Sequence, residues 1–177
     1  CAFDEAIIEH TPCKSTSVHI HKIFLSLQAL LQRESSLRPT NATEVLHELA
    51  EKMPRRSLVI LFSDMFDKVE DPQPLFAALQ HLKHKKHEVL LFHVSDHATE
   101  QRFDFEERPH EFIDLETGQR LKLQPQQVRE AYQTQVSAFM KDLKLRCGAY
   151  KIDLIEVDIR QGFQEILYAY LVKRRKM

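Results

Sequence analysis

Two aspartates follow the most apolar run of the sequence. The run covers residues 57–62, and Ser63, Asp64 and Asp67 come directly after it. Side chains with hard oxygen atoms can ligate a divalent cation, and carboxylates can also move protons in catalysis. The same residue types end strands and cap helices, so their position alone leaves a structural role open for all three.

Three histidines with helical spacing form a second group that could do chemistry. His81, His84 and His87 recur every three residues, and a borderline metal could use the first two on one helical turn. Lys83, Lys85 and Lys86 lie in the same segment, and their positive charge opposes a bound cation. The pattern therefore favours a solvated basic face. His93 lies within an apolar run, which favours a hydrogen-bonded core histidine.

Covalent catalysis has little support in the sequence. There is no G-x-S-x-G elbow, and no cysteine is bracketed by a histidine that could activate it. A divalent-metal phosphohydrolase that uses Asp64, Asp67 and Asp96 stays open as an alternative. We expect no enzymatic activity.

The amino-acid composition excludes several further classes of protein. Three glycines are too few for a phosphate-binding loop, which argues against dinucleotide and P-loop enzymes. The net charge of −1 gives no drive toward nucleic acid. No apolar run approaches the roughly 20 residues that span a bilayer. Three widely spaced cysteines indicate a reducing compartment, so we expect the cytoplasm.

The chemistry-bearing residues sit among alternating helices and strands. Residues 57–62 and 89–94 are continuous apolar runs, typical of parallel strands covered on both faces. Amphipathic spacing predicts helices over 19–32, from a capping box at Asn41 to Pro54, and after Asp71. This alternation is the signature of an α/β fold with a mostly parallel sheet and helices on both faces.

The remaining segments complete the expected fold. Residues 2–8 read as the end of a strand and its exit. A β-hairpin insertion is expected near 111–123, with Gly118 supplying a positive φ in its turn. Further elements are a helix over 126–147, a strand over 152–157 and a last helix over 162–174 with its apolar residues facing inward.

Several stretches, taken in order, resemble one known family. They are AFDEAI at 2–7, RRSLVILFSDMFD at 55–67, HEVLLFHV at 87–94 and FIDLETG at 112–118. The set is similar to the bacterial DUF58 family, whose members carry a von Willebrand factor A-like (vWA-like) domain. The resemblance implies a Rossmann-like sheet and one vWA-like domain over residues 1–177, with an upstream part of that domain missing.

The resemblance also implies a metal-ion-dependent adhesion site (MIDAS) at the carboxyl ends of the strands. In such sites Mg²⁺ or Mn²⁺ is held by a DxSxS motif, a threonine and an aspartate. Asp64 matches the aspartate and Thr40 the threonine, with Ser63 and Asp67 as supporting neighbours. The DxSxS motif has no counterpart in this sequence, so the implied metal site is incomplete.

The resemblance favours a non-enzymatic protein-interaction module over an enzyme. The partner it implies is a MoxR-type AAA+ ATPase or a substrate of that ATPase. A metal-free scaffold of the same fold is the first alternative, and the phosphohydrolase is the second. Because a missing central strand would leave backbone groups of its neighbour unpaired, we expect the chain to self-associate when studied alone.

Overall fold

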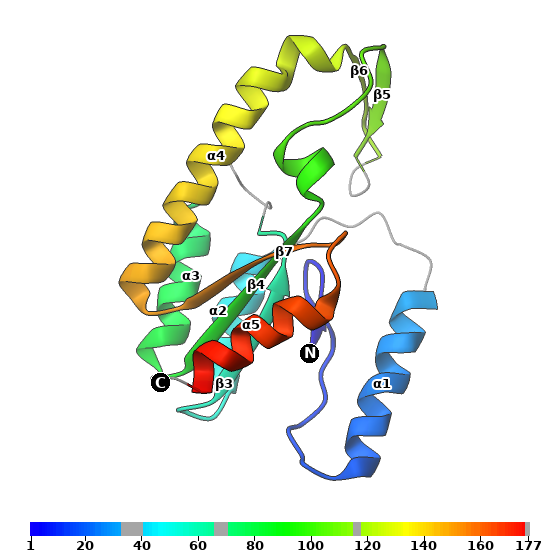
Figure 1. Ribbon diagram of the computed structural model, residues 1–177. Coiled ribbons are helices and arrows are strands. Elements are labelled where there is room, and N and C mark those ends of the chain that lie inside the picture. The colour runs from blue at the N-terminus through cyan, green and yellow to red at the C-terminus, as the bar shows by residue number, and fades with distance from the viewer. Residues whose placement is uncertain (33–40, 66–70, 115–117, 176–177) are drawn as a thin grey trace.

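A three-stranded parallel sheet forms the centre of the protein (Figure 1). The computed structural model describes residues 1–32, 41–65, 71–114 and 118–175. The strand order is β3-β4-β7, and both pairings are parallel. The strands are β3 (Leu58–Ser63), β4 (Glu88–Ser95) and β7 (Asp153–Asp158). The predicted parallel sheet of an α/β fold is confirmed.

Three helices cover one face of the sheet and enclose the main core. They are α2 (Ala42–Lys52), α3 (Gln73–His84) and α4 (Pro125–Tyr150). Burial of apolar surface is the main driving force for this packing. The centre of the core consists of almost fully buried side chains from all three helices and from β4: Leu46, Phe76, Leu79, Leu82, Leu91 and Leu143.

A single helix lies against the opposite face. This helix, α5 (Phe163–Arg175), crosses the sheet on the side away from α2 and α3 (Figure 1). Tyr170 of α5 makes an edge contact with Phe92, at 6.3 Å between ring centroids, and Phe92 is buried. Helices therefore flank the sheet on both faces, as the alternation of elements predicts.

Local sequence signals fix several element boundaries. The Asn41 side chain accepts a hydrogen bond from the Glu44 N–H at 3.4 Å, so Asn41 is the N-cap of α2, whereas the reciprocal bond of a capping box is replaced by one from the Asn41 N–H to the Asp4 carbonyl. The predicted hairpin is confirmed as β5 (His110–Ile113) paired with β6 (Arg120–Leu123) in antiparallel register. Gly118 has a φ of 72°, the left-handed conformation that the turn requires.

The long helix α4 extends beyond the sheet and supports that hairpin. The segment between β4 and β5 starts with a π-helical turn, η1 (His97–Gln101), and packs on α4 through aromatic rings. Phe103 contacts Tyr132 at 4.6 Å and Phe112 at 5.7 Å between centroids. Arg129 donates hydrogen bonds to the carbonyls of Phe103 and Phe105 at 3.2 and 3.0 Å.

Burial differs from the prediction at three elements. The apolar run of β3 is covered on one face only, since Leu58, Ile60 and Phe62 are 43%, 48% and 63% exposed. The amphipathic helix after residue 16 forms as α1 (Ser17–Gln32), but its apolar side chains are largely exposed. In α5 the expected inward residues Phe163, Leu167 and Leu171 are exposed as well, because they have no facing layer.

The N-terminal segment forms a hairpin rather than a strand end and its exit. Strand β1 (Ala2–Phe3) pairs in antiparallel fashion with β2 (Ile7–Glu9). The hairpin joins the main body where the Asn41 N–H donates to the Asp4 carbonyl at 3.1 Å. Within the residues that the structure describes, none of the helices combines the length and apolar character needed to cross a bilayer.

Candidate functional site at the carboxyl ends of the strands

The carboxyl ends of the three parallel strands meet at one edge of the sheet. Each strand is followed there by polar residues: Asp64 after β3, Asp96 after β4, and Asp158 at the end of β7. In open α/β sheets, ligands usually bind at this edge. This edge is therefore the candidate functional site of the protein.

Asp96 is already committed to structural contacts. One carboxylate oxygen accepts from the Ala98 N–H at 2.9 Å and caps η1, and the other lies 2.7 Å from the Arg160 guanidinium. The hydrogen bond from Arg160 lowers the pKa of Asp96 below its ordinary value. Because both carboxylate oxygens are occupied, Asp96 is a poor metal ligand or proton carrier. This weakens the hypothesis of a phosphohydrolase that uses Asp96.

Neighbouring contacts tie β4 to the residues after β7. The Ser95 carbonyl accepts from the Ile159 N–H at 3.1 Å, and the Ser95 hydroxyl accepts from the Gln101 amide at 3.1 Å. His97 Nδ1 lies 3.6 Å from an Asp158 carboxylate oxygen. These bonds join the ends of β4 and β7 and η1 into one polar network.

Asp64 lies near this network but is exposed to solvent. Burial raises the pKa of Glu100, and the negative charges of Asp64 and Asp96 add to that rise. Burial lowers the pKa of His93, while the charge of Asp64 acts in the opposite direction. Asp64 therefore lies close enough to both groups to influence them, although its own side chain is exposed.

The described start of the loop after β3, residues 63–65, forms a turn. The Ser63 hydroxyl accepts a hydrogen bond from the Met65 N–H at 3.1 Å. Met65 has a φ of 57°, which is uncommon for a residue other than glycine, and its side chain is buried in the core. Ser63 thus has a turn-forming role, and the buried Met65 fixes the loop so that Asp64 faces solvent.

The described residues of this edge do not make a metal site. Thr40 and Asp67, the other two members of the predicted set, lie outside the described residues. Among the residues that are described, no three histidine, cysteine or acidic side chains converge closely enough to hold an ion. Asp64 and Ser63 alone supply too few oxygen atoms for the six-coordinate shell that Mg²⁺ prefers.

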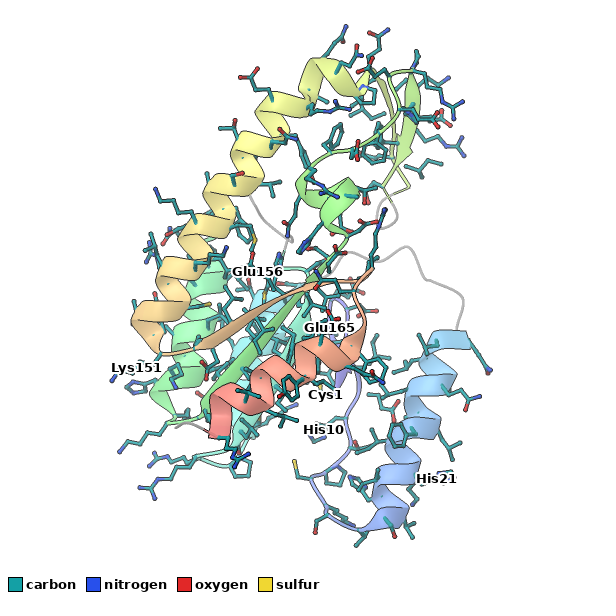
Figure 2. The ribbon with its side chains drawn as sticks, viewed as in Figure 1. Cys1, His10, His21, Lys151, Glu156 and Glu165 are labelled. Atoms are coloured by element: carbon teal, nitrogen blue, oxygen red, sulfur yellow. The ribbon has the colours of Figure 1, made fainter. Side chains whose placement is uncertain are left out.

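The three histidines at helical spacing do not act together. His81 contacts Glu51 and His47, whereas His87 is buried and its Nδ1 accepts from the Ser57 N–H at 3.1 Å. Another histidine, His21, lies on α1 and is well separated from these three in Figure 2. The interpretation of His81 and His84 as part of a basic face agrees with their placement, and the metal interpretation does not.

Sequence reasoning missed the partners of the aspartates. Arg160 and Glu100 contribute to the network, yet neither is part of a recognisable motif. Arg160 is 64 residues from Asp96 in the chain. The one available signal was that β4 and β7 both end in aspartate-containing segments, which a parallel sheet brings together.

Fold and edge geometry define an α/β protein with a three-stranded parallel sheet and a polar network at its carboxyl edge. A comparison with known protein families matches residues 1–141 to the family described as "Protein of unknown function DUF58". The chain therefore belongs to the DUF58 family. Searches of the curated proteins and of the solved structures found no match.

Proposed function

We propose that the chain is a non-enzymatic protein-interaction module that binds a β-strand of its partner along the open edge of β3. The observation that carries this proposal is the combination of exposed apolar side chains and an open backbone edge on the same strand. Within the described part of the chain, β3 has β4 as its one neighbouring strand. An exposed edge is a template for an added strand.

The backbone of β3 presents its outward groups at three alternating residues. Ser57, just before the strand, uses both its N–H and its carbonyl toward the β4 side, bonding His87 and Glu88. Because successive residues of a strand direct their backbone groups to opposite sides, Leu58, Ile60 and Phe62 direct theirs toward the open edge. A partner strand would bond these three residues.

The same three residues carry the exposed apolar side chains. Phe62 stacks on Phe92 at 4.7 Å between ring centroids, and Phe92 in turn is covered by Tyr170 of α5. The apolar surface of the sheet therefore continues from the buried strand β4 onto the uncovered strand β3. Since complete burial of such a side chain contributes about 1.5–3 kcal/mol, covering three half-exposed ones contributes roughly 3 kcal/mol.

The finer features of this proposal come from the family resemblance. It adds a vWA-like identity, a MoxR-type AAA+ ATPase or its substrate as partner, and Mg²⁺ or Mn²⁺ held through Asp64 and Thr40. Contact through the β3 edge itself needs no metal. Without a partner, we expect the β3 edge of a second copy to serve as the added strand.

Sedimentation velocity tests the proposal on the chain alone. Phe62→Lys removes the most exposed apolar side chain of β3 and adds a charge to the edge, which disfavours strand addition. Leu145→Lys is the matched control, because Leu145 is also 63% exposed but lies on α4.

We expect the parent chain and Leu145→Lys to dimerise as the concentration rises from about 5 to about 500 μM, while Phe62→Lys stays monomeric. A parent chain that is monomeric throughout, or a dimer that Phe62→Lys leaves intact, would overturn binding through β3.

A further inference from the structure

A basic concavity lies at the opposite end of the sheet from the aspartates. It has a volume of about 780 Å³, within the range of roughly 300–1,000 Å³ of small-molecule sites. It lies beside the turns that precede β3 and β4. The residues that line it are all ionisable: Arg55, Arg56, Lys85, Lys86, His81, His84 and Glu51.

The charges in this concavity do not balance. Four lysines and arginines face one carboxylate, which leaves an excess of three positive charges with the histidines neutral. Glu51 is engaged by Lys85 at 2.9 Å and by His81 at 2.8 Å. Across the described ranges, Arg55, Arg56 and Lys86 form no ion pair, so their charge is available to a ligand.

The two turns that present these cations are bonded to each other. The Arg56 N–H donates to the Lys85 carbonyl at 3.5 Å, and the Glu88 N–H donates to the Ser57 carbonyl at 3.0 Å. The buried His87 accepts from the Ser57 N–H, and its carbonyl accepts from Lys83 Nζ at 3.0 Å. The cations therefore stand on a connected backbone platform rather than on independent loops.

Both turns hold a basic residue in a conformation that favours glycine. Arg56 has a φ of 62° and Lys86 a φ of 63°. Residues held in sparsely populated backbone regions tend to cluster at binding and catalytic sites. Here the two positive-φ positions hold two of the three cations that form no ion pair, Arg56 and Lys86.

We propose that this concavity binds a small anion that carries two or more phosphoryl groups. Arginine presents a planar fork of N–H donors that matches phosphate oxygens, and lysine adds a mobile point charge. No apolar or large aromatic side chain is among the lining residues, so the site recognises the phosphoryl groups rather than a nucleobase or lipid chain. This site is distinct from the β3 edge and does not depend on the proposed function.

Titration calorimetry with inorganic pyrophosphate at about 0.15 M salt tests the proposal, with citrate as a phosphate-free anion of comparable charge. The variants Arg56→Gly and Lys86→Gly each remove one cation where glycine relaxes the backbone, so we expect the thermal midpoint to be kept or raised. Arg102→Gly, a cation removed from the surface near α4, is the matched charge control. A nucleoside diphosphate in a parallel titration distinguishes a nucleotide from a simpler phosphate compound as the source of the phosphoryl groups.

We expect saturable pyrophosphate binding with a dissociation constant below about 1 mM, weakened about tenfold or more in both glycine variants and unchanged in Arg102→Gly. Three results would overturn the site: no saturable binding, equal binding of citrate, or an equal loss in the control. Equal affinity for the nucleoside diphosphate would support recognition of the phosphoryl groups alone, and much tighter binding would contradict it, because the nucleoside would then contribute to recognition.

Discussion

Two buried histidines make the stability of the protein depend on pH. Burial lowers the pKa of both His87 and His93 in the folded state. In the unfolded chain each takes up a proton near its ordinary pKa of about 6.5. Their contribution to stability is therefore complete above that pH and is lost as the pH falls toward the lower folded pKa, by up to about 1.4 kcal/mol per pH unit for each group.

We expect the free energy of unfolding in urea to fall between about pH 7.5 and about pH 5. His87→Gln should reduce this fall, because glutamine keeps an acceptor for the Ser57 N–H but does not titrate. The raised pKa of Glu100 acts in the opposite direction, so the comparison between variant and parent isolates the histidine. A parent and variant with the same pH dependence would contradict this assignment.

Cysteine reactivity should separate buried from exposed thiols. Cys147 is buried in the core, and burial raises its pKa to about 12, whereas Cys1 and Cys13 are exposed. Because the thiolate is the reactive form, we expect a thiol-specific reagent to label two cysteines in the native protein and a third after denaturation. Rapid labelling of Cys147 in the native state would show that the core opens readily.

A metal should not stabilise this chain. The described residues provide too few ligands near Asp64, so we expect equal thermal midpoints in EDTA and in millimolar Mg²⁺ or Mn²⁺. A cation at 100 times its dissociation constant would add about 2.7 kcal/mol, or roughly 5–10 °C in midpoint for a domain of this size. Such a shift, abolished by Asp64→Ala, would establish the metal-dependent form of the module instead.

The sequence identified Asp64 but not its surroundings. The aspartate follows an apolar run, and its position at the end of a strand could be predicted from that run alone. Its neighbourhood could not, because Glu100 is contributed by the turn after β4 and Arg160 by the loop after β7. Their proximity depends on sheet order, which a single sequence does not encode in local patterns.

At the scale of elements, local signals predicted the helices and strands well. The helix start at Asn41 and the turn at Gly118 both rest on bonds within a few residues, and both are confirmed. The prediction that β3 is covered on both faces was wrong. Apolar composition describes what a strand could bury, whereas its actual burial depends on which neighbours the tertiary fold supplies.

The packing of α3 against the sheet should dominate stability at this scale. Leu79 is fully buried in the core, so Leu79→Ala should cost about 2–5 kcal/mol of unfolding free energy through lost burial and a residual cavity. Leu145→Ala on the exposed side of α4 should change it by less than about 0.5 kcal/mol. Urea denaturation measures both, and similar losses would contradict the assignment of the core.

For the whole molecule, a net charge near zero conceals two separated regions of charge. Acidic groups gather at the carboxyl ends of the strands, and basic groups line the concavity at the opposite end. The alternation of apolar runs and amphipathic segments correctly predicted an α/β fold, but a sum of charges contains no information about where each charge lies. The exposed apolar side chains of α1, β3 and α5 were equally hidden, because hydrophobic spacing does not reveal what covers a face.

The open edge of β3 is the central claim, and residue-resolved amide hydrogen exchange tests it most directly. We expect the amides of Leu58, Ile60 and Phe62 to exchange rapidly in dilute protein and to become protected as concentration rises, while those of Val59 and Leu61, directed toward β4, stay protected throughout. Two results would contradict strand addition at β3. In one, the three outward amides exchange slowly at every protein concentration; in the other, their exchange does not slow when the protein associates.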